Sequence, residues 1–373
     1  MDRVPAPATS LLRKFSLLLP SHTCSKKRSK VKSTHCSDLL ASMPQPASTD
    51  QSSTPNTVSS PSPKSLPGIL YAFWKFSRPH TVIGTTLSVL SLATLAGILS
   101  GTSSTPVEMV WAVLGALVAC LAGNVYIVGL NQLEDVDIDR INKPHLPLAS
   151  AEFSRRQGQW IVGICGAIAL LLSLTQGIFL TATVWFSLLI GTAYSLPPVR
   201  LKRFPFFASL CIFVVRGVIV NLGLFLHFQT KWGNPPQIPL AIWALTGFIL
   251  VFTFAIAIFK DVPDLEGDRR YNITTFTVQL GQKAVFNLAR WVLTVCYLGM
   301  IAAALLLPKI HAPFLVITHG LLLALLWWRS LNVDLGNRRA IARFYQFIWK
   351  LFFLEYLLFP LACAIAWWNG TRL

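Results

Sequence analysis

The chain has 373 residues, of which 53% are hydrophobic and only 13% are charged, and its formal net charge at pH 7 is +17. Its mean hydropathy is +0.56. With 24 Phe and 12 Trp, this is more apolar sequence than a soluble domain needs, and it is typical of a protein that crosses a membrane repeatedly. The composition therefore excludes an ordinary soluble globular protein and predicts an all-α integral membrane fold.

The first 65 residues differ from the rest of the chain. They contain 15 Ser and nine Lys or Arg but only three acidic residues. Such Ser-rich, basic and acid-poor composition is typical of an organelle transit peptide, although an uncleaved disordered tail is the alternative. We therefore expect a transit peptide or disordered extension in residues 1–65 and a membrane domain in residues 66–373. Composition does not distinguish a plastid transit peptide from a mitochondrial one.

Beyond residue 66, the sequence alternates between apolar runs and short polar breaks. Nine runs approach the ~20 residues that a helix needs to cross a bilayer. They lie near residues 80–100, 107–130, 160–176, 178–195, 208–227, 239–259, 286–307, 313–328 and 347–367. We therefore predict nine transmembrane helices, which place the two ends of this region on opposite sides of the membrane.

Basic residues are distributed unequally between the two sides that this topology defines. One side receives nineteen Lys and Arg residues, whereas the other receives only Lys231, Lys309 and Arg372. Because loops on one side of a membrane carry an excess of Lys and Arg, this bias supports the nine-span interpretation. The net charge thus reflects topology and targeting, and we expect no nucleic-acid partner.

Acidic residues are concentrated at two places on the basic side. The segment NQLEDVDIDR follows the second apolar run, and KDVPDLEGD follows the sixth. In the first segment, Asn131, Asp135 and Asp139 recur every four residues, which predicts that they line one side of a helix. In the second, Asp264 and Asp268 are also four apart and follow Asp261. Pro263 and Gly267 indicate that this helix end is frayed.

Carboxylates at this spacing repel one another unless a cation lies between them. Mg²⁺ prefers oxygen ligands and is usually bound by one or two carboxylates together with substrate phosphates. Basic side chains that could contact those phosphates follow the first motif at Lys143 and recur in YSLPPVRLKRFP. The pattern predicts a magnesium–diphosphate site, and solvated acids at the helix ends are the alternative interpretation.

The two acidic segments carry a family resemblance. NQLEDVDIDRINKP and KDVPDLEGD resemble the aspartate-rich motifs NQxxDxxxD and DxxxD of UbiA-type membrane prenyltransferases, and similarity extends from about residue 70 to 365. Four further segments are similar to the homogentisate phytyltransferase branch, especially its cyanobacterial members: GTAYSLPPVRLKRFP, RGVIVNLGLFLHF, AIAIFKDVPDLEGD and FYQFIWKLFFLEYLLFPLA. Those members lack an extension like residues 1–65, so the resemblance implies a plastid-targeted eukaryotic counterpart.

The resemblance implies nine helices around a central cavity that opens sideways to lipid. It also implies Mg²⁺ as cofactor, with Asp135, Asp139, Asp264 and Asp268 as metal ligands. The residues that would act on the Mg²⁺–diphosphate are Asn131, Asp135, Asp139, Asp261, Asp264 and Asp268. Those that would contact the substrates are Lys143, Tyr194, Lys202, Arg203 and Arg216, with Arg140 a weaker candidate.

The expected reaction is the transfer of a phytyl group from phytyl diphosphate to homogentisate with decarboxylation, a step toward tocopherol in a plastid inner envelope or thylakoid membrane. Arg216 and Asn221 lie inside the fifth apolar run. An intramembrane Arg is costly to insert, so we expect Arg216 to pair with the substrate carboxylate or a motif acid. A structural ion pair, or extension toward the basic side, is the alternative.

Other functions fit parts of this pattern. Within the family these are homogentisate geranylgeranyltransferase or solanesyltransferase, a naphthoate phytyltransferase and a chlorophyll synthase. A cation-coupled transporter also uses intramembrane acids, but it is expected to have acids or broken helices at mid-span. Here both acidic clusters lie at span ends on one side, which favours the enzyme. The sequence leaves the donor chain length and the oligomeric state open.

Overall fold

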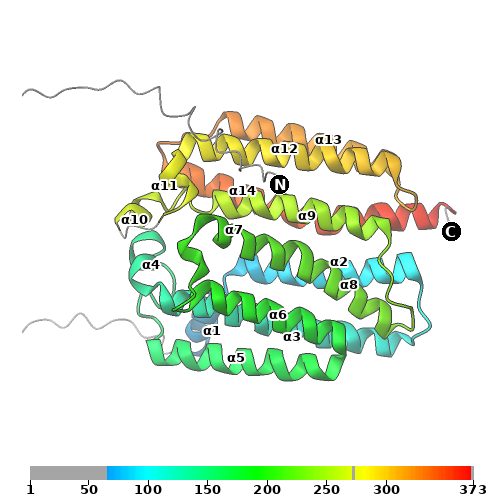
Figure 1. The fold of residues 1–373 in the computed structure, drawn as a ribbon, viewed down its shortest axis with the longest axis horizontal. Helices are drawn as coiled ribbons and strands as arrows, with labels where there is room; N and C mark the ends of the chain where they lie inside the picture. Colours follow the sequence, from blue (N-terminus) through cyan, green and yellow to red (C-terminus); the bar gives the residue numbers. More distant parts are fainter. Residues whose placement is uncertain (1–64, 271–273, 371–373) are drawn as a thin grey trace, which may run out of the picture. The chain divides into compact units, whose positions relative to one another are not determined.

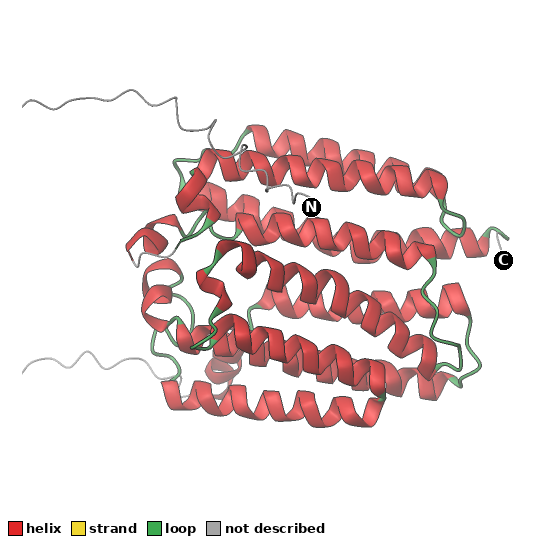
Figure 2. Ribbon diagram, viewed as in Figure 1, coloured by secondary structure: helices red, strands yellow, loops and turns green. Residues whose placement is uncertain are grey.

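The computed structural model describes residues 65–270 and 274–370. The predicted transit peptide lies outside these residues and stays a prediction. Within the described residues the secondary structure is helical throughout, with helices joined by loops and turns (Figure 2). The fold is therefore all-α.

Among the described residues, nine helical spans are long and apolar enough to cross a membrane. They are α2 (Pro79–Ser100), α3 (Pro106–Glu134), α5 (Arg155–Gln176), α6 (Ile178–Ser195), the continuous span Pro205–Lys231, α9 (Leu240–Phe259), α12 (Gln282–Leu306), α13 (Ala312–Leu331) and α14 (Arg338–Trp368). Each contains or closely overlaps one predicted apolar run, so the prediction of nine spans in a multi-pass membrane protein is confirmed.

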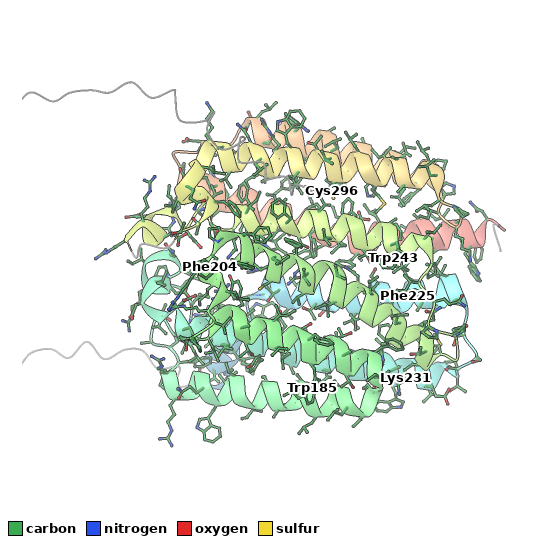
Figure 3. The ribbon with its side chains drawn as sticks, viewed as in Figure 1. Trp185, Phe204, Phe225, Lys231, Trp243 and Cys296 are labelled. Carbon is green, nitrogen blue, oxygen red and sulfur yellow. The ribbon has the colours of Figure 1, made fainter. Side chains whose placement is uncertain are left out.

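The fifth span is built from three consecutive pieces. These are α7 (Pro205–Phe213), the π-helical turn η2 (Val214–Ile219) and α8 (Val220–Lys231). Figure 3 shows Phe204, which precedes α7, and Lys231 toward opposite ends of the long helices. The span therefore crosses the whole layer of helices, with a wide turn in its interior.

In the part of the chain that the structure describes, five short helices join or precede the spans. They are α1 (Leu66–Phe76), α4 (Val136–Asn142), η1 (Leu201–Arg203), α10 (Leu265–Arg270) and α11 (Phe276–Leu280). Figure 1 shows α4, α10 and α11 at the same end of the long helices. This is the side that carries both acidic motifs.

Local sequence explains where several helices begin. Thr105 and Glu108 form a reciprocal capping box at the start of α3, and Ser154 and Gln157 form a second one at α5. Each box satisfies backbone N–H groups that the first helical turn leaves free. Between α5 and α6 the chain turns at Gly177, whose φ of 108° only glycine adopts readily.

Helix α14 begins nine residues before the apolar run that predicted it, because helical structure extends beyond the apolar layer. The Asn337 side chain accepts hydrogen bonds from the backbone N–H groups of Arg339 and Ala340 (3.0 and 3.3 Å). This cap starts a helix whose first turns are basic. The apolar pattern therefore predicts the part of α14 that crosses the membrane but not its basic first turns.

Aromatic packing forms much of the core between α9, α12 and α14. Phe252 of α9 lies against Phe352 of α14 with ring centroids 5.8 Å apart, and Phe248 of α9 meets Tyr297 of α12 edge-on at 5.5 Å. Offset and edge-to-face aromatic pairs each add to the stabilisation that burial gives. These contacts position α14, which contributes one wall of the site.

Candidate active site

All of the residues that the sequence predicted as site residues line one cavity of about 1290 Å³. They are Asn131, Asp135, Asp139, Lys143, Tyr194, Lys202, Arg203, Arg216, Asp261, Asp264 and Asp268. They come from segments up to 137 positions apart, from α3 to α10. The weaker candidate Arg140 does not line the cavity. It is exposed and pairs with Asp137 (2.8 Å).

The first acidic motif is bent, which corrects the prediction that its polar residues share one helix. Helix α3 ends at Glu134, Asp135 takes φ −113° and ψ 19°, and α4 follows. Hydrogen bonding continues across the bend, because Asp135 N–H bonds Asn131 O (3.1 Å) and Asp139 N–H bonds Asp135 O (2.8 Å). The bend directs α4 toward α10, with which it is in contact.

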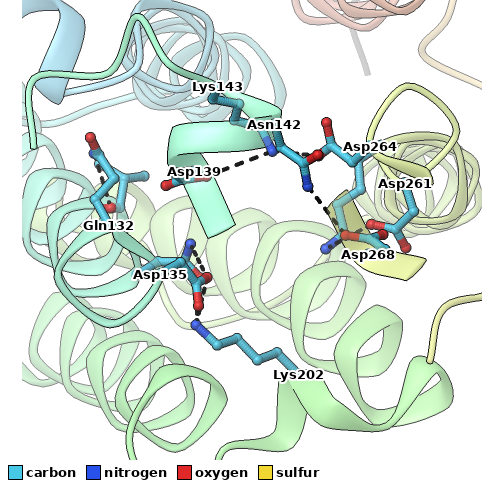
Figure 4. A network of polar contacts seen from close by, with 12 residues as sticks. Gln132, Asp135, Asp139, Asn142, Lys143, Lys202, Asp261, Asp264 and Asp268 are labelled. Carbon is cyan, nitrogen blue, oxygen red and sulfur yellow. Dashed lines mark hydrogen bonds and ion pairs between the residues drawn. The ribbon is translucent and has the colours of Figure 1, made fainter. Parts of the chain in front are cut away.

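Asp135 is the centre of one group of polar contacts. One oxygen, Oδ2, lies 2.7 Å from Lys202 Nζ and 3.2 Å from Asn131 Nδ2, and Oδ1 lies 3.2 Å from Arg200 Nη2. Burial lowers the pKa of Lys202, while the neighbouring Asp135 carboxylate opposes that shift. Figure 4 shows Lys202 reaching Asp135 from below in the view.

A second group forms around the other motif. Lys143 forms an ion pair with Asp264. Asn142 Nδ2 donates to Asp268 Oδ1 (3.3 Å). The expected frayed end is a turn followed by α10, with Asp264 N–H bonded to Asp261 O (3.2 Å). Both motifs therefore have the same plan: a membrane span ends, the chain turns at an acid, and a short helix follows.

Close packing brings the two short helices together. A Cβ atom at Gly267 of α10 would lie 2.2 Å from Oδ1 of Asn142 in α4. A larger residue at position 267 would therefore displace the Asn142 side chain, and glycine lets α4 and α10 meet as they do. Figure 4 shows Asp139 and Asn142 between the Asp135 group and the Asp264–Asp268 group. This contact links the two motifs across one end of the cavity.

The buried carboxylates are electrostatically unfavourable as they stand. Burial, with Asp261 and Asp264 nearby, raises the pKa of Asp268 to about 7. Burial also raises the pKa of Asp139 and of Asp261, although Lys143 and Lys260 respectively oppose it most. Oδ2 of Asp139 is buried without a hydrogen-bond partner among the described residues. This set of hard oxygen atoms fits a divalent cation.

The carboxylates do not form a ready-made metal cage. Within residues 65–270 and 274–370, no three His, Cys, Asp or Glu side chains are grouped closely enough to hold a metal ion. A cation here would take one or two ligands from each motif and would need further oxygen ligands, such as phosphate.

Lys260 belongs to the site, although the sequence indicated it only as a basic residue on that side of the membrane. Its Nζ lies 3.1 Å from Tyr194 Oη and 3.5 Å from Asp261 Oδ1. Burial alone would lower the pKa of Lys260, but Asp261 and Tyr194 outweigh it and raise that pKa well above its usual value. Arg203 also lines the cavity; it is exposed and forms no ion pair with the described residues.

Arg216 lies deeper in the cavity, on η2. Its guanidinium stacks over Trp349 at 5.2 Å and over Phe352 at 5.6 Å from the ring centroids. In the described part of the chain no carboxylate pairs with it, so the motif acids are not its partners here. Trp349 also lies 4.8 Å from the ring of His80. Trp349 was not predicted as a site residue, because the aromatic residues of α14 all follow an ordinary apolar pattern.

Away from the charged end, the cavity wall carries no charged side chain except Arg216, is mostly apolar and is made partly of small side chains. It includes Ala119 and Gly123 of α3, Val184 and Leu188 of α6 and Leu224 of α8. At 1.5 Å per residue, Ala119 lies ~18 Å along α3 from Asn131. The cavity therefore extends from a charged mouth into an apolar interior.

A multi-pass helical protein with such a cavity belongs to the class of membrane proteins that hold an amphiphile with an anionic head and an apolar tail. A more specific assignment follows from comparison. The model of the UbiA prenyltransferase family matches residues 88–351, so the chain belongs to that family and is a prenyltransferase.

Curated relatives cover most of this chain. The homogentisate phytyltransferase of a Synechocystis strain is 58% identical over 303 residues, which are 81% of this chain and 98% of the relative. The chloroplastic homogentisate phytyltransferase 1 of Arabidopsis thaliana is 43% identical over 80% of this chain and 76% of its own length. The chloroplastic homogentisate solanesyltransferase of that plant is 39% identical over 78% and 76%.

Solved structures support the fold. A UbiA homologue from Archaeoglobus fulgidus, described as bound to GPP and Mg²⁺, superposes with a TM-score of 0.54 at 18% identity, covering 78% of this chain and 99% of that one. A homologue from Aeropyrum pernix gives a TM-score of 0.53 at 14% identity, covering 75% and 97%. At this identity the likeness concerns the fold alone.

Proposed function

We propose that this protein is a homogentisate phytyltransferase that uses Mg²⁺. It transfers the phytyl group of phytyl diphosphate to homogentisate, and the acetate side chain loses CO₂. The observation that carries the proposal is the cavity itself, where both acidic motifs and several cations meet at one end of an apolar interior. The choice of substrates is supported by the relatives of that name, at 58% and 43% identity.

The metal proposal rests on the two acidic motifs. Asp135 and Asp139 of the first motif, with Asp264 and Asp268 of the second, would hold Mg²⁺ at the charged end. When bound, Mg²⁺ neutralises the negative charge that develops on the departing diphosphate. Asn131 donates to the Asp135 carboxylate (3.2 Å), and the backbone carbonyl of Asp261 accepts the N–H of Asp264 (3.2 Å). Both residues would act with these carboxylates on the Mg²⁺–diphosphate. A solved relative described as bound to GPP and Mg²⁺ supports the choice of metal.

Cationic side chains bind and orient the diphosphate. Lys202 and Lys143 already lie at the two acidic groups, paired with Asp135 and Asp264. Because phosphate oxygens offer these ammonium groups alternative acceptors, the lysines can shift from the carboxylates to the substrate. Tyr194, at the end of α6, is hydrogen-bonded by Lys260 and contributes to the same end of the cavity, as does Arg203 of η1. Preorganised charges of this kind favour cleavage of the allylic C–O bond.

The apolar interior serves the next stage of the reaction. Ala119, Val184 and Leu224 surround the prenyl chain and keep water from the electron-poor allylic carbon, which water would otherwise attack. A ring carbon of homogentisate forms the new C–C bond and gives up its proton. The acetate group releases CO₂ and gains a proton, which leaves a methyl group.

Arg216 is our candidate for the acceptor carboxylate. Its guanidinium faces the cavity, is stacked against aromatic rings and has no carboxylate partner in the described part of the protein. A homogentisate carboxylate would provide the missing anion, and its aromatic ring could pack beside Trp349. Arg is suited to this role because its planar group binds carboxylates with two parallel hydrogen bonds.

The function is tested by product analysis. Membranes that contain the full chain are incubated with Mg²⁺, labelled homogentisate and, in parallel, phytyl, geranylgeranyl or solanesyl diphosphate. We expect a decarboxylated phytyl quinol as the main product. A main product from solanesyl or geranylgeranyl diphosphate would replace the donor assignment, and labelled product that retains the carboxylate would refute the decarboxylation.

We further propose a plastid membrane location, which the Ser-rich, basic residues 1–65 and the chloroplastic relatives support. Residues 1–65 fused to a fluorescent protein should deliver it to plastids, because such composition is typical of transit peptides. Delivery to mitochondria, or retention in the cytosol, would contradict this location. The catalytic proposal would stand, since it depends on other residues.

A further inference from the structure

The wide turn that carries Arg216 is an unusual element inside a membrane span. Residues Val214–Ile219 form a π-helical turn between α7 and α8. Such turns are rare inside helices and occur frequently at functional sites. In hydrocarbon, loosened backbone groups must be satisfied by nearby side chains. Whatever satisfies this turn therefore determines where the Arg216 side chain points.

Asn221, in the first turn of α8 directly after η2, provides that support. Its Nδ2 donates to the carbonyl oxygens of Arg216 (3.1 Å) and Gly217 (2.8 Å). The Asn221 residue has no exposed surface. Because one amide group bonds two successive carbonyls of the wide turn, it holds the backbone of Arg216 directly.

Tyr356 of α14 holds Asn221 in turn. The Tyr356 hydroxyl donates to Asn221 Oδ1 at 2.9 Å, and only 1% of Tyr356 is exposed. With its oxygen occupied in this way, the amide of Asn221 must present its N–H groups to the turn. Tyr356 lies on the helix that also supplies Trp349 and Phe352, the two rings against which the Arg216 guanidinium stacks. One helix thus fixes both the backbone and the side chain of Arg216.

Two glycines complete the fit around the turn. A Cβ at Gly217 would lie 2.7 Å from the Cα of Leu250, so η2 is pressed against α9. A Cβ at Gly84 of α2 would lie 3.0 Å from Arg216 Nη1. Gly84 therefore leaves room for the guanidinium against α2.

We propose that Tyr356 and Asn221 are positioning residues that aim Arg216 at the carboxylate of the aromatic acceptor. Neither residue lines the cavity, and both act through the wide turn. The inference rests on the proposed role of Arg216 in the function above. It assigns acceptor recognition to a hydrogen-bonded link from α14 to η2, separate from the residues at the diphosphate end.

The test removes only the hydroxyl of Tyr356 in the full chain. In Tyr356→Phe, the KM for homogentisate should rise about threefold to tenfold, because Asn221 loses the hydrogen bond from the Tyr356 hydroxyl and Arg216 is misdirected. The same hydroxyl also bonds the Ser88 side chain. The KM for prenyl diphosphate should stay unchanged. In the Arg216→Leu background, the same change should raise the homogentisate KM no further, since residues that act through one another are not additive.

A matched control and a second variant accompany the test. Tyr297 is equally buried, and its hydroxyl has no hydrogen-bond partner among the described residues. Tyr297→Phe should therefore leave both KM values unchanged. Gly84→Ala should raise the homogentisate KM by crowding the guanidinium, without weakening α2, because Ala favours a helix more than Gly does.

The possible outcomes separate this inference from the proposed function. If Arg216→Leu raises the homogentisate KM but Tyr356→Phe does not, the positioning role is wrong and the carboxylate role of Arg216 stands. If Tyr356→Phe changes the KM values for donor and acceptor equally, or adds fully to Arg216→Leu, its role is structural. If Arg216→Leu leaves the homogentisate KM unchanged, both the inference and the carboxylate role fail.

Discussion

Asp135→Asn and Asp264→Asn should each reduce turnover by more than about 100-fold, because each removes an anionic ligand for Mg²⁺ and the diphosphate. Asn keeps the shape and one oxygen of the side chain, so Lys202 and Lys143 retain a hydrogen-bond acceptor. The protein should therefore remain inserted and folded. The measurement is turnover of labelled homogentisate in membranes, with thermal stability followed in parallel.

A third aspartate provides the matched control. Asp334 is exposed in the loop before α14 and does not line the cavity, and its Oδ1 accepts the backbone N–H of Gly336 (2.8 Å), which Asn can also accept. Asp334→Asn makes the same charge change and should leave turnover intact. EDTA should abolish turnover by the wild-type enzyme, and added Mg²⁺ should restore that turnover. Activity within about threefold of wild type in both motif variants would refute the metal assignment.

The nine spans could be predicted because their signal is local. A run of apolar residues long enough to cross hydrocarbon is readable in the sequence without knowledge of what packs beside it. The charged end of the cavity could also be predicted, because topology places both acidic motifs on one side. Their grouping around Asp135 and around Asp264 then depends on side chains from the following loops.

The bend at Asp135 could not be predicted in the same way. The segment NQLEDVDIDR contains neither Pro nor Gly, and its spacing fits a straight helix. The helix turns there so that α4 can meet α10, where Asn142 and Asp268 are 126 positions apart in the chain. Tertiary contacts of this kind override local preference.

The wide turn at Arg216 also depends on tertiary contacts that the sequence does not reveal. RGVIVNLGLFL reads as an ordinary apolar helix with two polar interruptions. The wide turn is held by Asn221 at the start of α8, by Tyr356 from α14 and by the tight approach of Gly217 to α9. The sequence identified Arg216 as costly within a membrane, and only the packed structure shows how it is held.

Arg216→Leu should raise the KM for homogentisate roughly tenfold to hundredfold and leave the KM for prenyl diphosphate nearly unchanged. The reason is the loss of a charge-assisted hydrogen bond to the acceptor carboxylate, which is worth ~1.5–3 kcal/mol. Leu fills much of the space against Trp349 and Phe352, so the cavity wall should persist. Arg216→Lys keeps the charge but lacks the planar guanidinium group, so its KM for homogentisate should lie between those of the wild type and of Arg216→Leu.

Arg140→Leu is the control for charge alone, because Arg140 is exposed and does not line the cavity, although its partner Asp137 lies at the charged end. It should change neither KM. If Arg216 acted through a motif acid, Arg216→Leu would weaken Mg²⁺ and diphosphate binding instead. If it were only structural, thermal stability would fall with no selective kinetic change. These three roles predict different KM patterns for the one variant. A change confined to the KM for prenyl diphosphate would therefore rule out a role of Arg216 in binding the acceptor carboxylate.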